Sequence, residues 1–243
     1  MLVFSETSMF FRREAEVDLL CCMVTVALFY VMTRRRRGEC YLVDYSCYRP
    51  PDDRKMNTEA CIYFCVSTEP AVADRMDLQW KVDLRSGLGE ETAVARFLFS
   101  DDRIATLEEA RVEMEESFAA VLDDLFAKTC VKPWEIDILI VNVSTFSPAP
   151  SLAAWVVNHY KMKETVKIFN LSGMGCSANV IAVDMAKDLF KMYPDSYALV
   201  VGSENTTVNA NYGGSDKGMM LTNCLFRVGG NTMLLSNKAR DAA

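Results

Sequence analysis

Residues 136–203 alternate between short apolar runs and longer amphipathic segments, and this alternation limits the folds open to the chain. Three apolar runs rich in β-branched residues predict buried strands. These runs are IDILIVNVS (136–144), VKIFNL (166–171) and SYALVVGS (196–203). Helical segments fill the gaps between them. Strand, helix, strand, helix, strand predicts an α/β layered fold with a parallel or mixed sheet.

The two intervening helices carry their own end signals. SLAAWVVNHYKM begins at Ser151, a good N-cap residue after Pro150. The second helix is expected from about Ser177 to Lys191, where Pro194 stops it. One buried and one wet side of this helix are predicted by the spacing of Val180, Ile181, Asp184 and Leu189.

Outside this core the signals are less regular. Thr106 and Glu109 form a T-x-x-E capping box that opens another helix. The apolar stripe of that helix is Met114, Phe118, Val121, Leu122 and Leu125, and the glutamates expected to face water are Glu108, Glu113, Glu115 and Glu116. Residues 224–237 predict further strands around Gly229 and Gly230. Residues 40–105 are the least legible, with CYRPPDD a turn or linker and RSGLGEET (85–92) a loop.

Composition excludes several classes of function. The formal net charge of −7 argues against a nucleic-acid partner. The nine cysteines are irregularly spaced, form no CxxC pair and favour free thiols over a disulfide framework. With one histidine in the chain, no metal site is expected.

Residues 1–38 form the first predicted unit, and residues 39–243 the second. LLCCMVTVALFYVMT (19–33) has no charged residue and runs into four arginines, Arg34 to Arg37. The run is shorter than the roughly 20 residues of a full bilayer span. A membrane-associated helix with the following chain in the cytosol is expected, and a buried core helix is the alternative. The arginines either contact anionic lipid head groups or form a solvated face.

The sequence FNLSGMGCSANVIAVDMAKDLF (169–190) places Cys176 between a strand and a helix. Gly173 and Gly175 allow a tight turn, and Ser177 follows where the helix begins. The positive end of a helix dipole favours a thiolate, the form that a nucleophile needs. Cys176 is therefore predicted either as the nucleophile of a strand–turn–helix elbow or as a buried cysteine in a tight turn.

The same segment closely resembles the active-site segment of the plant 3-ketoacyl-CoA synthases, the condensing enzymes of very-long-chain fatty acid elongation. Other blocks resemble that family in the same order. They are YLVDYSCYRP (41–50), SGLGEET (86–92), VNVSTFSPAPSLAAWVVNHYKM (141–162) and NCLFRVGGNTMLLSNKARD (223–241). The resemblance covers most of residues 41–241.

The resemblance implies a thiolase-like fold, of which residues 39–243 form the amino-terminal half. It implies that Cys176 takes the acyl group from acyl-CoA and that malonyl-CoA supplies two carbons, with no cofactor. It also implies an endoplasmic-reticulum membrane location. The family's chains continue further, and their catalytic histidine and asparagine lie in that second half. A single half would expose an apolar face, so poor solubility or a homo- or heterodimer with other condensing enzymes is expected.

Departures from the family's pattern leave alternatives open. Ser172 and Asn179 replace glycines. His159 and Asn158 are weak candidates to assist Cys176, because a lone histidine on an amphipathic helix is usually structural. One alternative is an inactive partner of full-length synthases. The other, a cysteine hydrolase, needs a histidine base and is poorly supported.

Overall fold

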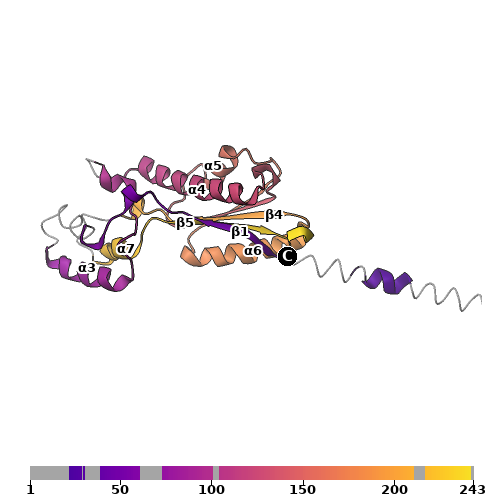
Figure 1. Ribbon diagram of the computed structural model, residues 1–243, viewed down its shortest axis with the longest axis horizontal. Coiled ribbons are helices and arrows are strands. Elements are labelled where there is room, and N and C mark those ends of the chain that lie inside the picture. Colours follow the sequence, from indigo (N-terminus) through magenta and orange to yellow (C-terminus); the bar gives the residue numbers. More distant parts are fainter. Residues whose placement is uncertain are drawn as a thin grey trace, which may run out of the picture.

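A single mixed β-sheet lies at the centre of the computed structural model, with helices on both of its faces (Figure 1). The structure describes residues 22–28, 30, 39–60, 73–100, 104–210 and 217–241. The strand order is β1-β5-β4-β2-β3. The strands are β1 (Tyr41–Cys47), β2 (Ile138–Asn142), β3 (Lys167–Leu171), β4 (Tyr197–Ser203) and β5 (Gly230–Ser236).

The direction of the strands follows from their connections. β3, β2 and β4 are parallel, as expected for strands that are joined through helices. β5 pairs antiparallel with both β4 and β1, so the sheet is mixed. β1 lies in the part of the sequence from which no strand was predicted.

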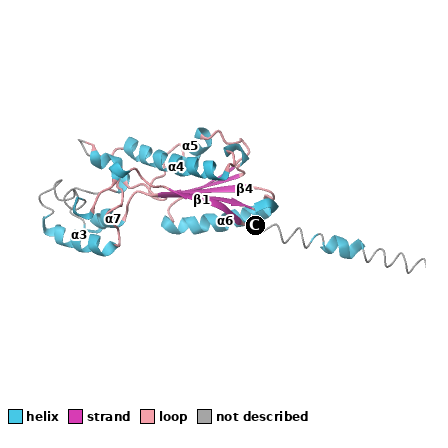
Figure 2. Ribbon diagram, in the orientation of Figure 1, coloured by secondary structure: helices cyan, strands magenta, loops and turns pink. Residues whose placement is uncertain are grey.

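Helices cover the two faces of the sheet unequally. α4 (Leu107–Thr129) and α5 (Leu152–His159) lie on one face, and α6 (Ala178–Met192) lies on the other (Figure 2). α3 (Ala73–Ser86) and α7 (Lys217–Leu225) pack together beyond one end of the sheet. β5 confirms the strand predicted around Gly229 and Gly230, but α7 shows that no strand begins at residue 224, because Cys224 and Leu225 end a helix. Short 3₁₀ turns are η1 (Asp52–Arg54), η3 (Arg96–Phe99), η4 (Pro133–Glu135), η5 (Gly175–Ser177), η6 (Thr207–Asn209) and η7 (Ala239–Asp241).

The two central strands explain why both faces must be covered. Every residue of β2 and β4 is buried. Successive side chains point to opposite faces, so each strand contributes to two cores. Leu139 and Leu199 pack toward α4 and α5, whereas Ile140 and Val200 pack toward α6. Burial of both faces requires the near-continuous apolar runs seen in the sequence.

The predicted start of α4 is confirmed. Thr106 is its N-cap, and the Thr106 hydroxyl accepts from the Glu109 backbone N–H at 3.1 Å. The whole predicted apolar stripe is buried. Glu113 was expected to face water, and this was wrong because it is 7% exposed. Its carboxylate accepts from the backbone N–H and hydroxyl groups of Thr206 and Thr207, which places it under the loop after β4.

The amphipathic character of α6 is confirmed, but its buried side differs from the simple apolar spacing. The residues that face the sheet are Ala178, Ala182, Ala186 and Phe190. Val180 and Ile181 point outward and are 74% and 40% exposed. Small residues four apart let the helix approach the sheet closely, so the larger apolar residues are left on the outer face.

Most of the predicted membrane segment lies outside the described residues, including Arg34 to Arg37. Residues 22–28 are helical and exposed. Across the described ranges, no helix combines the length and the apolar character that a membrane span needs.

Candidate active site

The turn between β3 and α6 has the tight geometry that its glycines predicted. Gly173 has φ +75° and Gly175 has φ +61°, a left-handed conformation that side chains with a Cβ disfavour. An ideal Cβ at either position would meet no atom within 4 Å. The glycines are therefore needed for backbone conformation and not for space.

Cys176 lies in η5, which runs directly into α6, so its side chain is carried at the amino-terminal end of a helix. The residue is exposed, which rules out the alternative of a cysteine buried in the turn. Ser177 supports the turn, since its hydroxyl donates to the Met174 carbonyl at 2.8 Å. The structure thus brings Gly173, Gly175, Cys176 and Ser177 together as the sequence predicted.

Two residues that sequence reasoning missed hold this turn against the sheet. The Ser144 hydroxyl accepts from the backbone N–H groups of Met174 at 3.2 Å and Gly175 at 2.8 Å. The Glu204 carboxylate in turn accepts from the N–H groups of Ser144 and Thr145 and from the Thr145 hydroxyl. The only sequence signal is their position at the ends of predicted strands, since Ser144 is the last residue of 136–144 and Glu204 directly follows 196–203.

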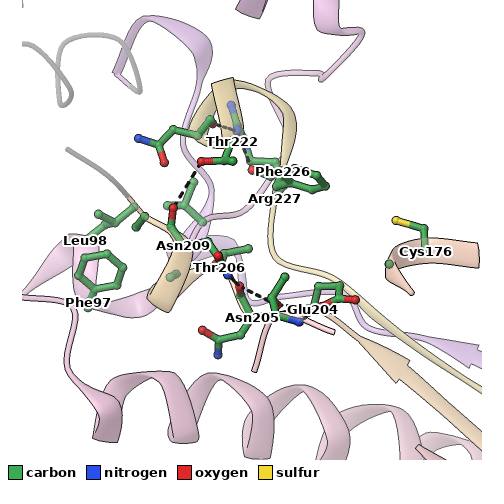
Figure 3. Close-up of a pocket in the computed structure, with 16 residues that line it drawn as sticks. Phe97, Leu98, Cys176, Glu204, Asn205, Thr206, Asn209, Thr222, Phe226 and Arg227 are labelled. Atoms are coloured by element: carbon green, nitrogen blue, oxygen red, sulfur yellow. Dashed lines mark hydrogen bonds between the residues drawn. The ribbon is translucent and has the colours of Figure 1, made fainter. Parts of the chain in front are cut away.

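A cavity of about 200 Å³ lies beside Cys176. Its wall is largely apolar, with Phe97, Leu98 and Phe226 among the lining residues, and Cys176 and Glu204 also line it (Figure 3). Arg227 lies at the same cavity and is held by the Asn223 carbonyl at 2.7 Å. Apolar walls with a few placed polar groups are typical of ligand pockets. The thiol is therefore open to a ligand that carries an apolar chain.

His159 and Asn158 are not part of this site. α5 connects the parallel strands β2 and β3, so its last residues lie near the amino-terminal end of β3. Cys176 follows the carboxyl-terminal end of β3, at the opposite end of the sheet. The His159 ring stacks on Trp155, with centroids 4.6 Å apart. The Asn158 side chain accepts from the Lys161 amine at 3.2 Å. Neither residue lines the cavity.

Asn179 fills a space next to the strands below the turn. Its side-chain oxygen accepts from the Asn142 amide at 3.3 Å. Asn142 pairs in register with Gly202 across β2 and β4. An ideal Cβ on Gly202 would lie 2.3 Å from the Asn179 oxygen, so Gly202 leaves room for the Asn179 side chain.

With this geometry described, comparison with known proteins identifies the family. The family described as "FAE1/Type III polyketide synthase-like protein" matches residues 30–243. The chain belongs to this family. Within it, the chain is 39% identical to 3-ketoacyl-CoA synthase 17 of Arabidopsis thaliana over 241 residues, which cover 99% of this chain and 49% of that protein. It is 45% identical to 3-ketoacyl-CoA synthase 4 of the same plant over 228 residues, covering 93% and 44%. The chain thus spans about half the length of these relatives.

Comparison with solved structures confirms the fold class. 1,3,6,8-Tetrahydroxynaphthalene synthase from Streptomyces coelicolor, a bacterial type III polyketide synthase, superposes with a TM-score of 0.66 at 21% identity, covering 82% of this chain and 57% of that one. CsyB complexed with CoA-SH gives 0.64 at 20% identity, covering 82% and 57%. The predicted thiolase-like α/β fold with a mixed sheet is confirmed.

The contact between Gly202 and Asn179 gives a prediction for stability. Gly202→Ala should lower the free energy of unfolding by about 1–3 kcal/mol, because the new methyl group forces the Asn179 side chain away and leaves the buried Asn142 amide without this hydrogen bond. In an Asn179→Gly background the same change should cost less than about 1 kcal/mol. Chemical denaturation of the four proteins in this double-mutant cycle measures the coupling.

Gly229→Ala is the matched control, since a Cβ there meets no atom within 4 Å. Its cost should stay below about 1 kcal/mol. Equal costs for Gly202→Ala in both backgrounds would show that Asn179 does not occupy the space beside Gly202.

Proposed function

We propose that the chain performs the acyl-capturing chemistry of a very-long-chain 3-ketoacyl-CoA synthase, with Cys176 as the nucleophile. The observation that carries this proposal is an exposed cysteine at a helix start, on a left-handed glycine turn, facing a largely apolar cavity. Membership of the condensing-enzyme family supports the reaction class. The names of the Arabidopsis relatives support the substrate class.

The first step is transfer of a fatty acyl group. The Cys176 thiolate attacks the carbonyl carbon of acyl-CoA, the new C–S bond forms, and CoA leaves as a thiolate that takes up a proton. The product is an acyl thioester on Cys176. Covalent capture divides a difficult condensation into two easier reactions. The apolar walls of the cavity suit an alkyl chain, which gains by leaving water.

The second step is condensation with malonyl-CoA. Loss of CO₂ from malonyl-CoA leaves a carbanion next to its thioester, which attacks the carbonyl carbon of the acyl group on Cys176. The C–S bond breaks, Cys176 is restored, and 3-ketoacyl-CoA two carbons longer is released. Both steps use CoA thioesters and need no metal. Within the described part of the chain, no group of three or more histidine, cysteine or acidic residues could hold a metal ion.

Decarboxylation needs donors that stabilise negative charge, and one such donor is worth roughly 10²–10³ in rate. His159, the only histidine of the chain, lies at the far edge of the sheet from Cys176. We propose that the histidine and asparagine for this step come from the second half of a full-length synthase, acting with this chain as a dimer or as its continuation.

The outer face of α6 supports that partner. Val180, Ile181 and Met192 on this helix are 74%, 40% and 71% exposed. No described element covers this side of α6 in Figure 1. Exposed apolar side chains gathered on one helix mark a contact surface. Because the matched relatives are about twice as long, we propose that the second half of a synthase packs here.

We also propose that the chain is anchored at the endoplasmic-reticulum membrane with Cys176 on the cytosolic side. The uncharged run 19–33 and the arginines after it support this orientation. The full chain should float with vesicles that contain anionic lipid, whereas a chain lacking residues 1–38 should remain in the dense fraction. Equal flotation of both proteins would argue against the anchor.

Acyl capture is tested directly by mass spectrometry. Incubation of the full chain with a long-chain acyl-CoA should add one acyl mass to the peptide that contains Cys176, and hydroxylamine should remove it. Cys176→Ser should abolish this thioester. Cys47→Ser is the matched control, because Cys47 is also an exposed free cysteine and lies at the end of β1. A folded wild-type chain without any adduct on Cys176 would refute the nucleophile role.

The contact surface on α6 predicts a second result. Replacing Val180 and Ile181 by serine should weaken co-purification with a full-length 3-ketoacyl-CoA synthase by at least about tenfold, because the buried apolar area is lost. Leu107→Ser on α4 is the control, since Leu107 is 71% exposed and lies on the opposite face of the sheet. Unchanged co-purification of the Val180 and Ile181 variant would place the contact elsewhere.

A further inference from the structure

The turn that carries Cys176 has little packing to fix its position. Its side chains at Ser172, Met174, Cys176 and Ser177 are exposed. Gly173 and Gly175 contribute no side chain at all. Hydrogen bonds must therefore hold this turn in place. Among the described residues, the side chains that form hydrogen bonds between the loop after β2 and this turn are Ser144 and Ser147.

The bonds from Ser144 are the ones that fix the backbone. Its hydroxyl oxygen accepts from two consecutive N–H groups, those of Met174 and Gly175, directly before the nucleophile. The left-handed conformation of Gly173 and Gly175 turns the chain around this one oxygen. Ser147 differs, because its hydroxyl contacts only the hydroxyl of Ser172, at 2.9 Å.

Ser144 is itself held by a charged group. The Glu204 carboxylate accepts from the Ser144 N–H at 3.0 Å and from the Thr145 N–H at 2.8 Å. It also accepts from the Thr145 hydroxyl at 2.7 Å. Hydrogen bonds to a charged acceptor are roughly twice as strong as neutral ones. Glu204 directly follows β4, whose residues are all buried, so the carboxylate is anchored to the rigid centre of the sheet.

We propose that Ser144 is a positioning residue for Cys176 and that Glu204 fixes Ser144. This inference rests on the proposed role of Cys176 as the acyl-accepting nucleophile. Thr145 and Glu204 also line the cavity beside Cys176. Glu204 therefore helps to fix the position of the Cys176 sulfur and also forms part of the cavity wall that would contact the acyl group.

The proposal matters for rate because thioester attack is sensitive to geometry. Sulfur and carbonyl carbon must approach to roughly 3–3.5 Å in alignment, and a displacement of about 1 Å can cost on the order of 10² in rate. A small alkylating reagent that reaches an exposed thiol from many directions makes no such demand. Comparing acyl transfer with alkylation therefore distinguishes a displaced Cys176 sulfur from general damage to the site.

The experiment compares Ser144→Ala, Ser144→Thr and Ser147→Ala with the wild-type 243-residue chain. Ser144→Ala should slow acyl transfer from acyl-CoA to Cys176 by about tenfold or more. Iodoacetamide should modify Cys176, measured on its own peptide, at a rate within about threefold of wild type. Ser144→Thr keeps the hydroxyl and should restore acyl transfer to within about threefold. Ser147→Ala should match wild type in both reactions.

Amide hydrogen exchange provides a readout that needs no acyl transfer. Exchange at Met174 and Gly175 should rise at least about fivefold in Ser144→Ala and stay unchanged in Ser147→Ala, because only the first variant removes their acceptor. Unchanged exchange in Ser144→Ala would overturn the proposal. So would an acyl-transfer rate equal to wild type, or an equal loss in acyl transfer and alkylation.

Failure of the proposed function has a different signature. In that case wild-type chain takes no acyl group, although iodoacetamide still modifies Cys176. A role of Ser144 in positioning Cys176 for acyl transfer is then refuted as well. Amide hydrogen exchange at Met174 and Gly175 still decides whether Ser144 holds the turn.

Discussion

Burial of β2 and β4 on both faces is the constraint on which the rest of the structure depends. Each strand contributes side chains to two cores, one under α4 and α5 and one under α6. A parallel pair that is buried in this way cannot shift by one residue, because every side chain would exchange faces. The register fixed at Ile140 and Val200 therefore also fixes where the chain leaves the sheet.

The loops that follow β2, β3 and β4 lie together at the carboxyl-terminal ends of these strands and form the site. Ser144 follows β2, Cys176 follows β3 and Glu204 follows β4, so three loops from parallel strands converge at their carboxyl ends. Ligands of open α/β sheets bind outside this edge. The loops are joined to one another by hydrogen bonds, from Glu204 through Ser144 to the turn before Cys176. A rigid core thus positions residues that lie on otherwise exposed loops.

The sequence was informative wherever one local signal decides the structure. The β-branched runs, the caps at Thr106 and Ser151, and the glycine turn at Cys176 all depend on near neighbours in the chain. Contacts between distant segments were not accessible. Glu113 is buried because Thr206 and Thr207 lie above it, 93 and 94 residues later. Ser144 and Glu204 were missed for the same reason, since they meet only through the order of the strands.

Under the proposed function, the described residues account for acyl capture better than for the condensation that follows it. The proposed capture of an acyl group needs an accessible sulfur, a fixed turn and an apolar cavity, and described residues supply all three. The proposed condensation also needs groups that move protons and stabilise a carbanion. The chain's one histidine is stacked on Trp155 at the end of α5, and moving it to Cys176 would require the helix to reverse between β2 and β3. The parallel pairing of those strands fixes the direction of α5, so His159 stays at the end of the sheet opposite Cys176, and the proposed condensation relies on groups other than His159.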